Sequence, residues 1–136
     1  MSISLHENNT QEESNRVGVG ANSLVLDAPF FLQSVGNVVS KAVAAVRIVG
    51  VNNTEATFAS DNVTVAKATV TYVPETANRL YEVATSAAIT VDDETKYYDL
   101  TAAGIVDAAT ESTTTGQVEL VKFLTGTTGA FKIVNL

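Results

Sequence analysis

The sequence predicts an all-β fold: a small β-barrel or sandwich of short antiparallel strands, preceded by an extended polar N-terminal arm. Short apolar runs, separated by Gly, Asn, Asp and Pro, succeed one another along most of the chain, as is typical of such folds. Hydrophobic residues make up 46% of the 136 residues, yet there are only four Tyr, five Phe and no Trp. The apolar content is therefore mainly small and β-branched, which suits thin sheets.

The first 16 residues differ from the rest of the chain. They are almost entirely polar, and only Ile3 and Leu5 could bury an apolar side chain. We therefore expect residues 1–16 to form an extended or disordered arm. Residues 17–136 are long enough for one hydrophobic core but not two, which predicts a single β-rich domain.

Nine runs are expected to be strands. They are residues 24–26, 30–33, 38–41, 46–51, 65–73, 80–84, 97–100, 118–124 and 131–134. The clearest is 65–73, where apolar and polar residues alternate until Pro74 ends the run. Ala and Lys within 38–49 would allow a short helix, but turn residues on both sides favour a strand. Residues 101–109 could hold one helical turn, and Gly104 argues against more.

Threonine-glycine clusters punctuate the end of the chain. Residues 113–116 and 125–129 lack the pattern of a phosphate-binding loop and are interpreted as turns. The second cluster joins runs 118–124 and 131–134, which predicts a closing β-hairpin. Apolar residues lie on both faces of 118–124, so this strand is expected to be central and covered on both sides.

The charge balance excludes several classes of protein. Fifteen acidic residues oppose eight scattered basic ones, giving a net charge of -7, which disfavours binding to nucleic acid and to anionic membranes. Without cysteine there can be no disulfide, thiolate metal site or cysteine nucleophile. No secretory signal or membrane-length apolar run is seen, and we expect a soluble protein made in a cytoplasm.

Candidate catalytic and metal-binding groups are few. The single histidine, His6, lies in the polar arm, where a solvated side chain is expected. Asp92, Asp93 and Glu94 lack the alternating spacing and central glycine of a calcium loop, which predicts a solvated turn. We therefore expect no metal site here.

Three further patterns favour structure over chemistry. Glu82 with Asp99 could be proposed as a glycosidase pair, as in any acidic β-protein. The Gly18-Val19-Gly20 stretch lacks the rest of a dinucleotide fingerprint and predicts a turn or bulge. Sequons beginning at Asn8, Asn52 and Asn62 are interpreted as turns. We expect neither a cofactor nor an enzyme.

The adjacent rings of Phe30 and Phe31 should point to opposite faces of a strand. One ring is expected in the core, and the other needs a second cover, either a partner subunit or the same chain. Both alternatives remain open from the sequence.

Most of the chain from residue 18 to 135 resembles the small capsid decoration, or cement, proteins of tailed bacteriophages. The resemblance rests on residues 18–42, 57–75, 96–124 and 129–135, and especially on the strings YYDLT, TTTGQ and the final FKI-V-N. The sequence departs from that pattern at residues 93–95 and in its longer arm.

The resemblance implies a non-enzymatic virion protein that binds the outside of an assembled capsid and stabilises it. Its implied partners are the major capsid protein and other copies of itself, with a trimer favoured, and neither nucleic acid nor membrane. The implied location is the capsid surface of the virion, after synthesis in the host cytoplasm. The expected partner contacts are Ile3, Leu5, Arg16, Phe30 and Phe31.

Two alternatives remain. One is another virion role, as a head-fibre base, a tail subunit or a head-tail connector subunit. The other is a glycan-binding β-module, which would need an exposed aromatic platform. Only four tyrosines could build one: Tyr72, Tyr81, Tyr97 and Tyr98.

Overall fold

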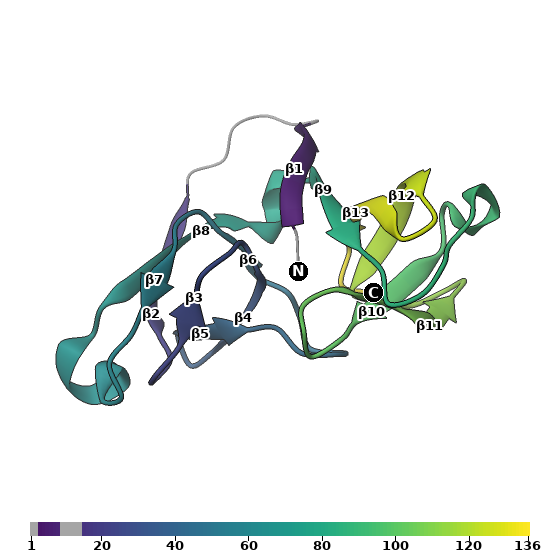
Figure 1. Cartoon of the computed structure of the whole chain (residues 1–136). Coiled ribbons are helices and arrows are strands. Elements are labelled where there is room, and N and C mark those ends of the chain that lie inside the picture. The colour runs from purple at the N-terminus through teal and green to yellow at the C-terminus, as the bar shows by residue number, and fades with distance from the viewer. Residues whose placement is uncertain (1–2, 9–14) are drawn as a thin grey trace.

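The computed structural model describes the backbone of residues 3–8 and all atoms of residues 15–136. It is mostly β, with 48% strand and 9% helix, which confirms the predicted fold class. Figure 1 shows two groups of strands side by side, a barrel half and a sheet half. The barrel half comprises residues 15–74; the sheet half comprises residues 75–136 together with the N-terminal strand.

The barrel half contains a closed five-stranded barrel in the order β2-β5-β4-β6-β8. Its strands are β2 (Arg16–Gly20), β4 (Phe31–Val35), β5 (Val38–Lys41), β6 (Gly50–Asn52) and β8 (Thr69–Pro74). Strands β2 and β5 run parallel, whereas the other pairs are antiparallel. The barrel half also contains a small pair, β3 (Val25–Leu26) with β7 (Ala56–Thr57), and the helical turn η1 (Asn62–Ala66).

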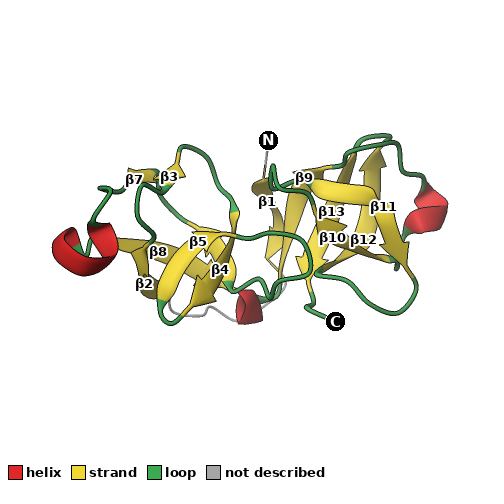
Figure 2. Ribbon diagram, turned by 90° about the horizontal axis from the view of Figure 1, so that it is seen from below, coloured by secondary structure: helices red, strands yellow, loops and turns green. Residues whose placement is uncertain are grey.

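The sheet half is a six-stranded sheet in the order β1-β9-β13-β12-β10-β11. Its strands are β1 (Ile3–Asn8), β9 (Arg79–Ala84), β10 (Tyr97–Leu100), β11 (Val106–Ser112), β12 (Val118–Thr125) and β13 (Thr128–Ile133), with the short helical turns η2 (Glu75–Ala77) and η3 (Val91–Asp93). An isolated bridge joins Thr85 to Val106, and the Ser86 N–H donates to the Val106 carbonyl at 2.8 Å. The sheet thus curls until the end of β9 meets β11 (Figure 2).

The two halves share one hydrophobic core. Its members from the barrel half are Phe31, Ala42, Ile48 and Val51, and they pack with the buried face of the sheet half. A second cluster, which includes Phe30, fills the interior of the barrel. One part of the outer barrel wall is therefore covered by the sheet half.

The N-terminal part of the chain runs along both halves. Strand β1 pairs antiparallel with β9, and β2 pairs antiparallel with β8. Because β8 and β9 are themselves joined through η2, strands β1 and β2 lie beside them in the opposite chain order, β1 in the sheet half and β2 in the barrel half (Figure 1). Residues 3–8 of the expected arm are extended, as strand β1.

Most of the predicted strands are present, but the clearest one is wrong in its first half. Residues 62–66 form η1, and β8 begins only at Thr69. The Asn62 side chain is fully buried and causes this turn: its amide donates to the carbonyls of Gly20 at 2.7 Å and Ala68 at 3.0 Å, and its oxygen accepts from the Ala68 N–H at 2.9 Å. Side-chain to backbone bonds, two to nearby Ala68 and one to distant Gly20, have replaced the strand ladder here.

Three other predictions need correction. The stretch Gly18-Val19-Gly20, expected to be a turn or bulge, lies in β2 because it pairs with β5 on one side and β8 on the other. The possible helical turn at residues 101–109 is instead a turn followed by strand β11, which pairs with β10. Residues 38–49 contain no helix, but only their first part is strand, as β5 (Val38–Lys41). Residues 42–49 form a loop, so the predicted strand 46–51 is wrong in its first four residues, and β6 begins only at Gly50.

The closing hairpin is confirmed, with β12 and β13 joined by a tight turn between Thr125 and Thr128. The expectation that β12 is covered on both sides is wrong. Leu120 is fully buried, whereas Val121 is 37% exposed. The register of β12 against β13 shifts just after Leu120, so a bulge turns Val121 outward and brings Phe123 back against the core.

Candidate functional site

The two adjacent phenylalanines are both covered from within the chain. Phe31 meets Tyr81 of the sheet half edge to face, with ring centroids 6.0 Å apart. Phe30 lies in the barrel interior, with the Lys41 ammonium 4.3 Å from its ring centroid. Neither ring is at the surface, so of the two alternatives that the sequence left open, cover by the same chain is the one seen in this structure.

The other expected partner contacts lie on the N-terminal strands. Ile3 is paired with Val83 and Leu5 with Tyr81 along β1. The side chains of β1, including that of His6, lie outside the described residues. Arg16 is exposed at the start of β2. Ile3 and Leu5 therefore lie on β1, the edge strand of the sheet, and Arg16 lies on β2 of the barrel.

Two amide side chains fasten the halves together, and sequence reasoning missed both. The first is buried Gln117, just before β12. Its Oε1 accepts from the Leu100 N–H at 2.8 Å, and its Nε2 donates to the carbonyls of Val43, at 2.7 Å, and Val46. Every polar atom of this side chain is engaged within the protein.

The second amide is Asn135, after β13. Its Oδ1 accepts from the Ile48 N–H at 2.8 Å, and its Nδ2 donates to the Ile48 carbonyl and to Glu75 Oε2, both at 2.9 Å. Glu75 also forms an ion pair with Arg47. The loop between β5 and β6 is thus tied to the end of the chain by a side chain 87 residues away in sequence.

A cavity of about 320 Å³ opens beside these amides. Its lining comes from the β5–β6 loop, the approach to β12 and the end of the chain: Ala45, Val46, Arg47, Asp99, Thr115, Gly116, Gln117, Asn135 and Leu136. Several polar groups at its wall bond within the protein: Asp99 accepts from the Gln117 N–H at 3.2 Å, and the side chains of Gln117 and Asn135 are bonded as described.

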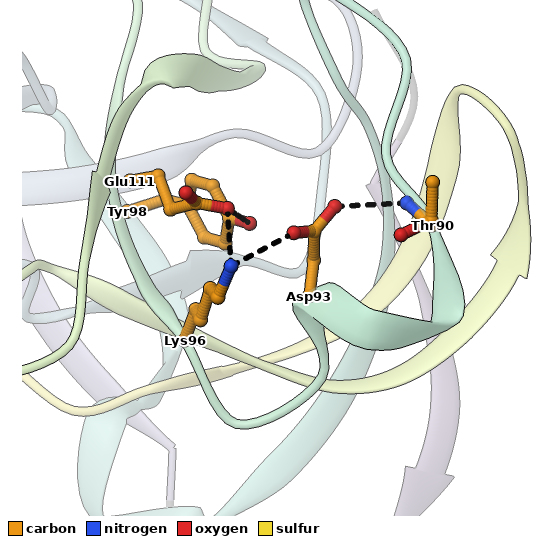
Figure 3. A network of polar contacts seen from close by, with 5 residues as sticks. All are labelled: Thr90, Asp93, Lys96, Tyr98 and Glu111. Carbon is orange, nitrogen blue, oxygen red and sulfur yellow. Dashed lines mark hydrogen bonds and ion pairs between the residues drawn. The ribbon is translucent and has the colours of Figure 1, made fainter.

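A second polar group joins η3 to strands β10 and β11 (Figure 3). The Lys96 ammonium donates to Asp93 Oδ1 at 3.2 Å and to Glu111 Oε1 at 3.1 Å. Tyr98 donates its hydroxyl to the same Glu111 oxygen at 3.2 Å, and Asp93 Oδ2 accepts from the Thr90 N–H at 2.9 Å. One cation thus bridges two carboxylates on different elements.

The pKa values of Asp93, Lys96 and Tyr98 shift in the directions that favour their bonded states. The Thr90 N–H is the main cause that lowers the pKa of Asp93, and the hydrogen bond to Glu111 is the main cause that raises the pKa of Lys96. Burial, followed by the nearby carboxylates, raises the pKa of Tyr98 well above its usual value. Groups held so firmly in one state are poor proton-transfer agents near neutral pH, and they serve as a structural clasp.

The acidic run at residues 92–94 lies in a turn, as expected, and its carboxylates separate. Asp93 joins the clasp, while Glu94 accepts from the Phe123 N–H at 2.7 Å. Within the described part of the chain, no three His, Asp or Glu side chains are grouped so as to hold a metal ion. Glu82 and Asp99 lie on strands that are not neighbours in the sheet.

The two described sequon asparagines are buried and bonded. Asn62 fixes η1, and Asn52 accepts from the Phe30 N–H at 2.7 Å while donating to the carbonyls of Ala28 and Thr54. They stabilise turns, as the sequence indicated, and neither side chain is open to a modifying enzyme in the folded protein.

No aromatic platform is available on the surface. All nine aromatic residues lie within residues 15–136; seven are buried, and Tyr97 and Phe123 are half-buried. Of the four tyrosines that a glycan-binding surface would need, three are inside the protein. This arrangement does not favour a glycan-binding module.

No protein-family model and no curated protein sequence matches this chain. The helices among the described residues are all too short to cross a membrane.

Proposed function

We propose that this protein is a structural component of a tailed-phage virion, a decoration protein that binds the outside of an assembled capsid and stabilises it. One observation supports the proposal most directly. Two polar residues in the strings that resemble decoration proteins form hydrogen bonds between the two β halves. Gln117 ends TTTGQ, and Asn135 ends FKI-V-N.

The fold suits such a role. Two β assemblies with a shared core and fastened loops give a firm body, as a protein that must hold shell subunits in place requires. Its N-terminal strand lies at the edge of the six-stranded sheet, and an edge strand can extend pairing to another chain through its backbone groups. In this proposal, residues 1–16 make contacts along the shell or a neighbouring copy, and the body covers the joint between shell subunits.

Binding to shells tests the proposal. Purified protein is mixed with phage capsids that lack it, and the pellet is analysed after sedimentation. We expect saturable binding, and capsids that withstand higher temperature once coated. Failure to bind any shell from the phage whose genome encodes the chain would refute the function.

The role of the arm needs its own variant. A chain that begins at residue 15 keeps β2 and the barrel intact, and it should lose most of its affinity for shells. The matched control is Thr114→Ala, an exposed threonine in the 113–116 turn, which should bind as the unaltered protein does. Unchanged binding of the shortened chain would rule out the arm as the attachment.

Copy number separates this role from the other virion roles. A decoration protein should be present in hundreds of copies per particle, whereas a head-fibre base, tail or connector subunit would be present in far fewer. Quantitative mass spectrometry of purified virions measures this ratio against the major capsid protein.

A further inference from the structure

The four most exposed valines of the described residues lie at two distant places. Val65 is 70% exposed, Val35 69% and Val17 59%, and all three belong to the barrel half. The fourth, Val91, is also 59% exposed and lies on η3 in the sheet half. Figure 2 shows η1 and η3 at opposite ends of the molecule.

Two of these barrel valines, Val35 and Val17, form part of a continuous outer wall. The strand register places Val35 opposite Val38, Val38 beside Val19, and Val19 opposite Thr69. Residues paired in this way point to the same face of a sheet, so one row of β-branched side chains crosses β4, β5, β2 and β8. Val17 stands two residues before Val19 and so points the same way.

A groove of about 220 Å³ lies next to this row. It is lined by eight uncharged residues: Val17, Gly18, Val19, Ser34, Asn37, Val39, Thr69 and Tyr72. The charges within two residues of its lining are all positive: Arg16 next to Val17, Lys41 two residues after Val39, and Lys67 two residues before Thr69. The groove is therefore suited to an uncharged side chain with an acidic neighbour.

The sheet half is acidic and so complements the positive charges beside the groove. Residues 15–74 carry four basic and three acidic side chains, whereas residues 75–136 carry four basic and nine acidic ones. At the η3 tip, exposed Val91 is followed by exposed Asp92. The neighbouring Asp93 is bonded to Lys96 and is only partly exposed, so Asp92 is the more exposed of the two carboxylates.

We infer that the barrel groove is an interface for a second copy of this chain, which inserts its η3 tip so that Val91 enters the groove and Asp92 faces Lys67. The contact joins two different surfaces, and so it is heterologous. Repeated from copy to copy, such a contact closes into a ring if the rotation allows and otherwise extends as a filament. The inference does not depend on a capsid partner.

A charge exchange tests the contact. Self-association is measured by sedimentation velocity over a concentration series, for Lys67→Glu, for Asp92→Lys and for the double variant. Each single change should weaken association about 2- to 5-fold, as expected for one ion pair at an interface rim. The double variant should recover most of the loss, because the pair is restored with reversed signs.

The apolar part is tested separately. Val35→Ser and Val91→Ser should each weaken association by at least about 10-fold, because each removes buried apolar surface from the contact. Matched controls are Lys122→Glu, an exposed lysine on β12, and Val25→Ser, a 44%-exposed valine on β3. Both controls should associate as the unaltered protein does, and circular dichroism checks that every variant is folded.

Several outcomes would overturn the inference. A chain that stays monomeric at its highest soluble concentration has no such interface. Association that survives all four single changes uses another surface. A monomer whose binding to capsids is lost in Lys67→Glu and Val35→Ser would show that the groove faces the shell rather than a second copy.

Discussion

The side chain of Asn135 pairs with the backbone of Ile48 in the way that a neighbouring strand would. Its Oδ1 accepts from the Ile48 N–H at 2.8 Å, and its Nδ2 donates to the Ile48 carbonyl at 2.9 Å. A side-chain amide has the same donor and acceptor as a peptide group. The Asn135 side chain thus makes the two hydrogen bonds with Ile48 that the backbone of a neighbouring strand would otherwise make.

Replacing Asn135 with alanine should therefore destabilise the protein. The change leaves the Ile48 N–H and carbonyl without these partners, at a cost of about 1–3 kcal/mol in the free energy of unfolding. Urea denaturation followed by circular dichroism measures it. The matched control is Asn53→Ala, at an exposed asparagine, which should change stability by less than about 0.5 kcal/mol. Equal effects of the two changes would contradict the strand-like role of Asn135.

Gly104 is required where the sheet half meets the barrel. Its φ is +79°, and a Cβ there would collide with the ring of Phe30. Gly104→Ala should cost about 2–4 kcal/mol, from the left-handed backbone together with the displaced ring. Gly126→Ala is the control, since a Cβ at Gly126 meets nothing within 4 Å. Thermal denaturation of both variants tests the difference, and a stable Gly104→Ala protein would show that the ring can move aside.

Leu120 should be essential to folding. It is fully buried in the shared core, and Leu120→Ala should cost about 2–5 kcal/mol. A polar residue at this position should abolish folding. Its neighbour Val121 lies outward across the bulge, so Val121→Ser should be tolerated. Guanidinium unfolding of the two variants compares them, and a larger loss for Val121→Ser would mean that the bulge is misplaced.

The clasp around Lys96 should make stability depend on pH at both extremes. The pKa of Asp93 is lowered below 3.8 in the folded protein, so its contribution is fully present above that value and is lost as the pH falls through the folded pKa. The pKa of Lys96 is raised above 10.5, so its contribution is present below 10.5 and is lost as the pH rises through the folded value.

Asp93→Asn isolates the acid limb of this dependence. The variant should be less stable than the unaltered protein at neutral pH, and the difference should shrink at pH values below about 3.8. Denaturant unfolding at a series of pH values measures it, and Asp92→Asn, on the same turn, is the matched control. A difference that does not vary with pH would show that the carboxylate charge of Asp93 does not stabilise the fold.

Periodicity and turn chemistry were enough to predict the class of the fold and most of its strands. The closing hairpin followed from two apolar runs and a glycine-containing turn, because hairpin pairing is local. Local pattern could not reveal that residues 62–66 form a helical turn. The turn depends on bonds from Asn62 to Gly20, 42 residues away.

The roles of Gln117 and Asn135 could not be predicted from the sequence for the same reason. Gln117 and Asn135 have ordinary polar side chains in the sequence, and only their partners in the β5–β6 loop, more than 70 residues away, give them a role. Phe30 and Phe31 were singled out for the right property, with one ring in each direction. What the sequence did not contain was that both directions lead into a core.

The reversed course of the N-terminal strands along β8 and β9 sets an order for assembly during synthesis. The barrel strands all lie within residues 16–74, so the barrel can close while later residues are still inside the ribosome. Strand β1 must wait for β9, since Ile3 pairs with Val83, and β9 in turn pairs with β13 near the end of the chain. The first strand to be made is thus among the last to pair in the sheet. Until then, its backbone N–H and carbonyl groups can pair with another chain.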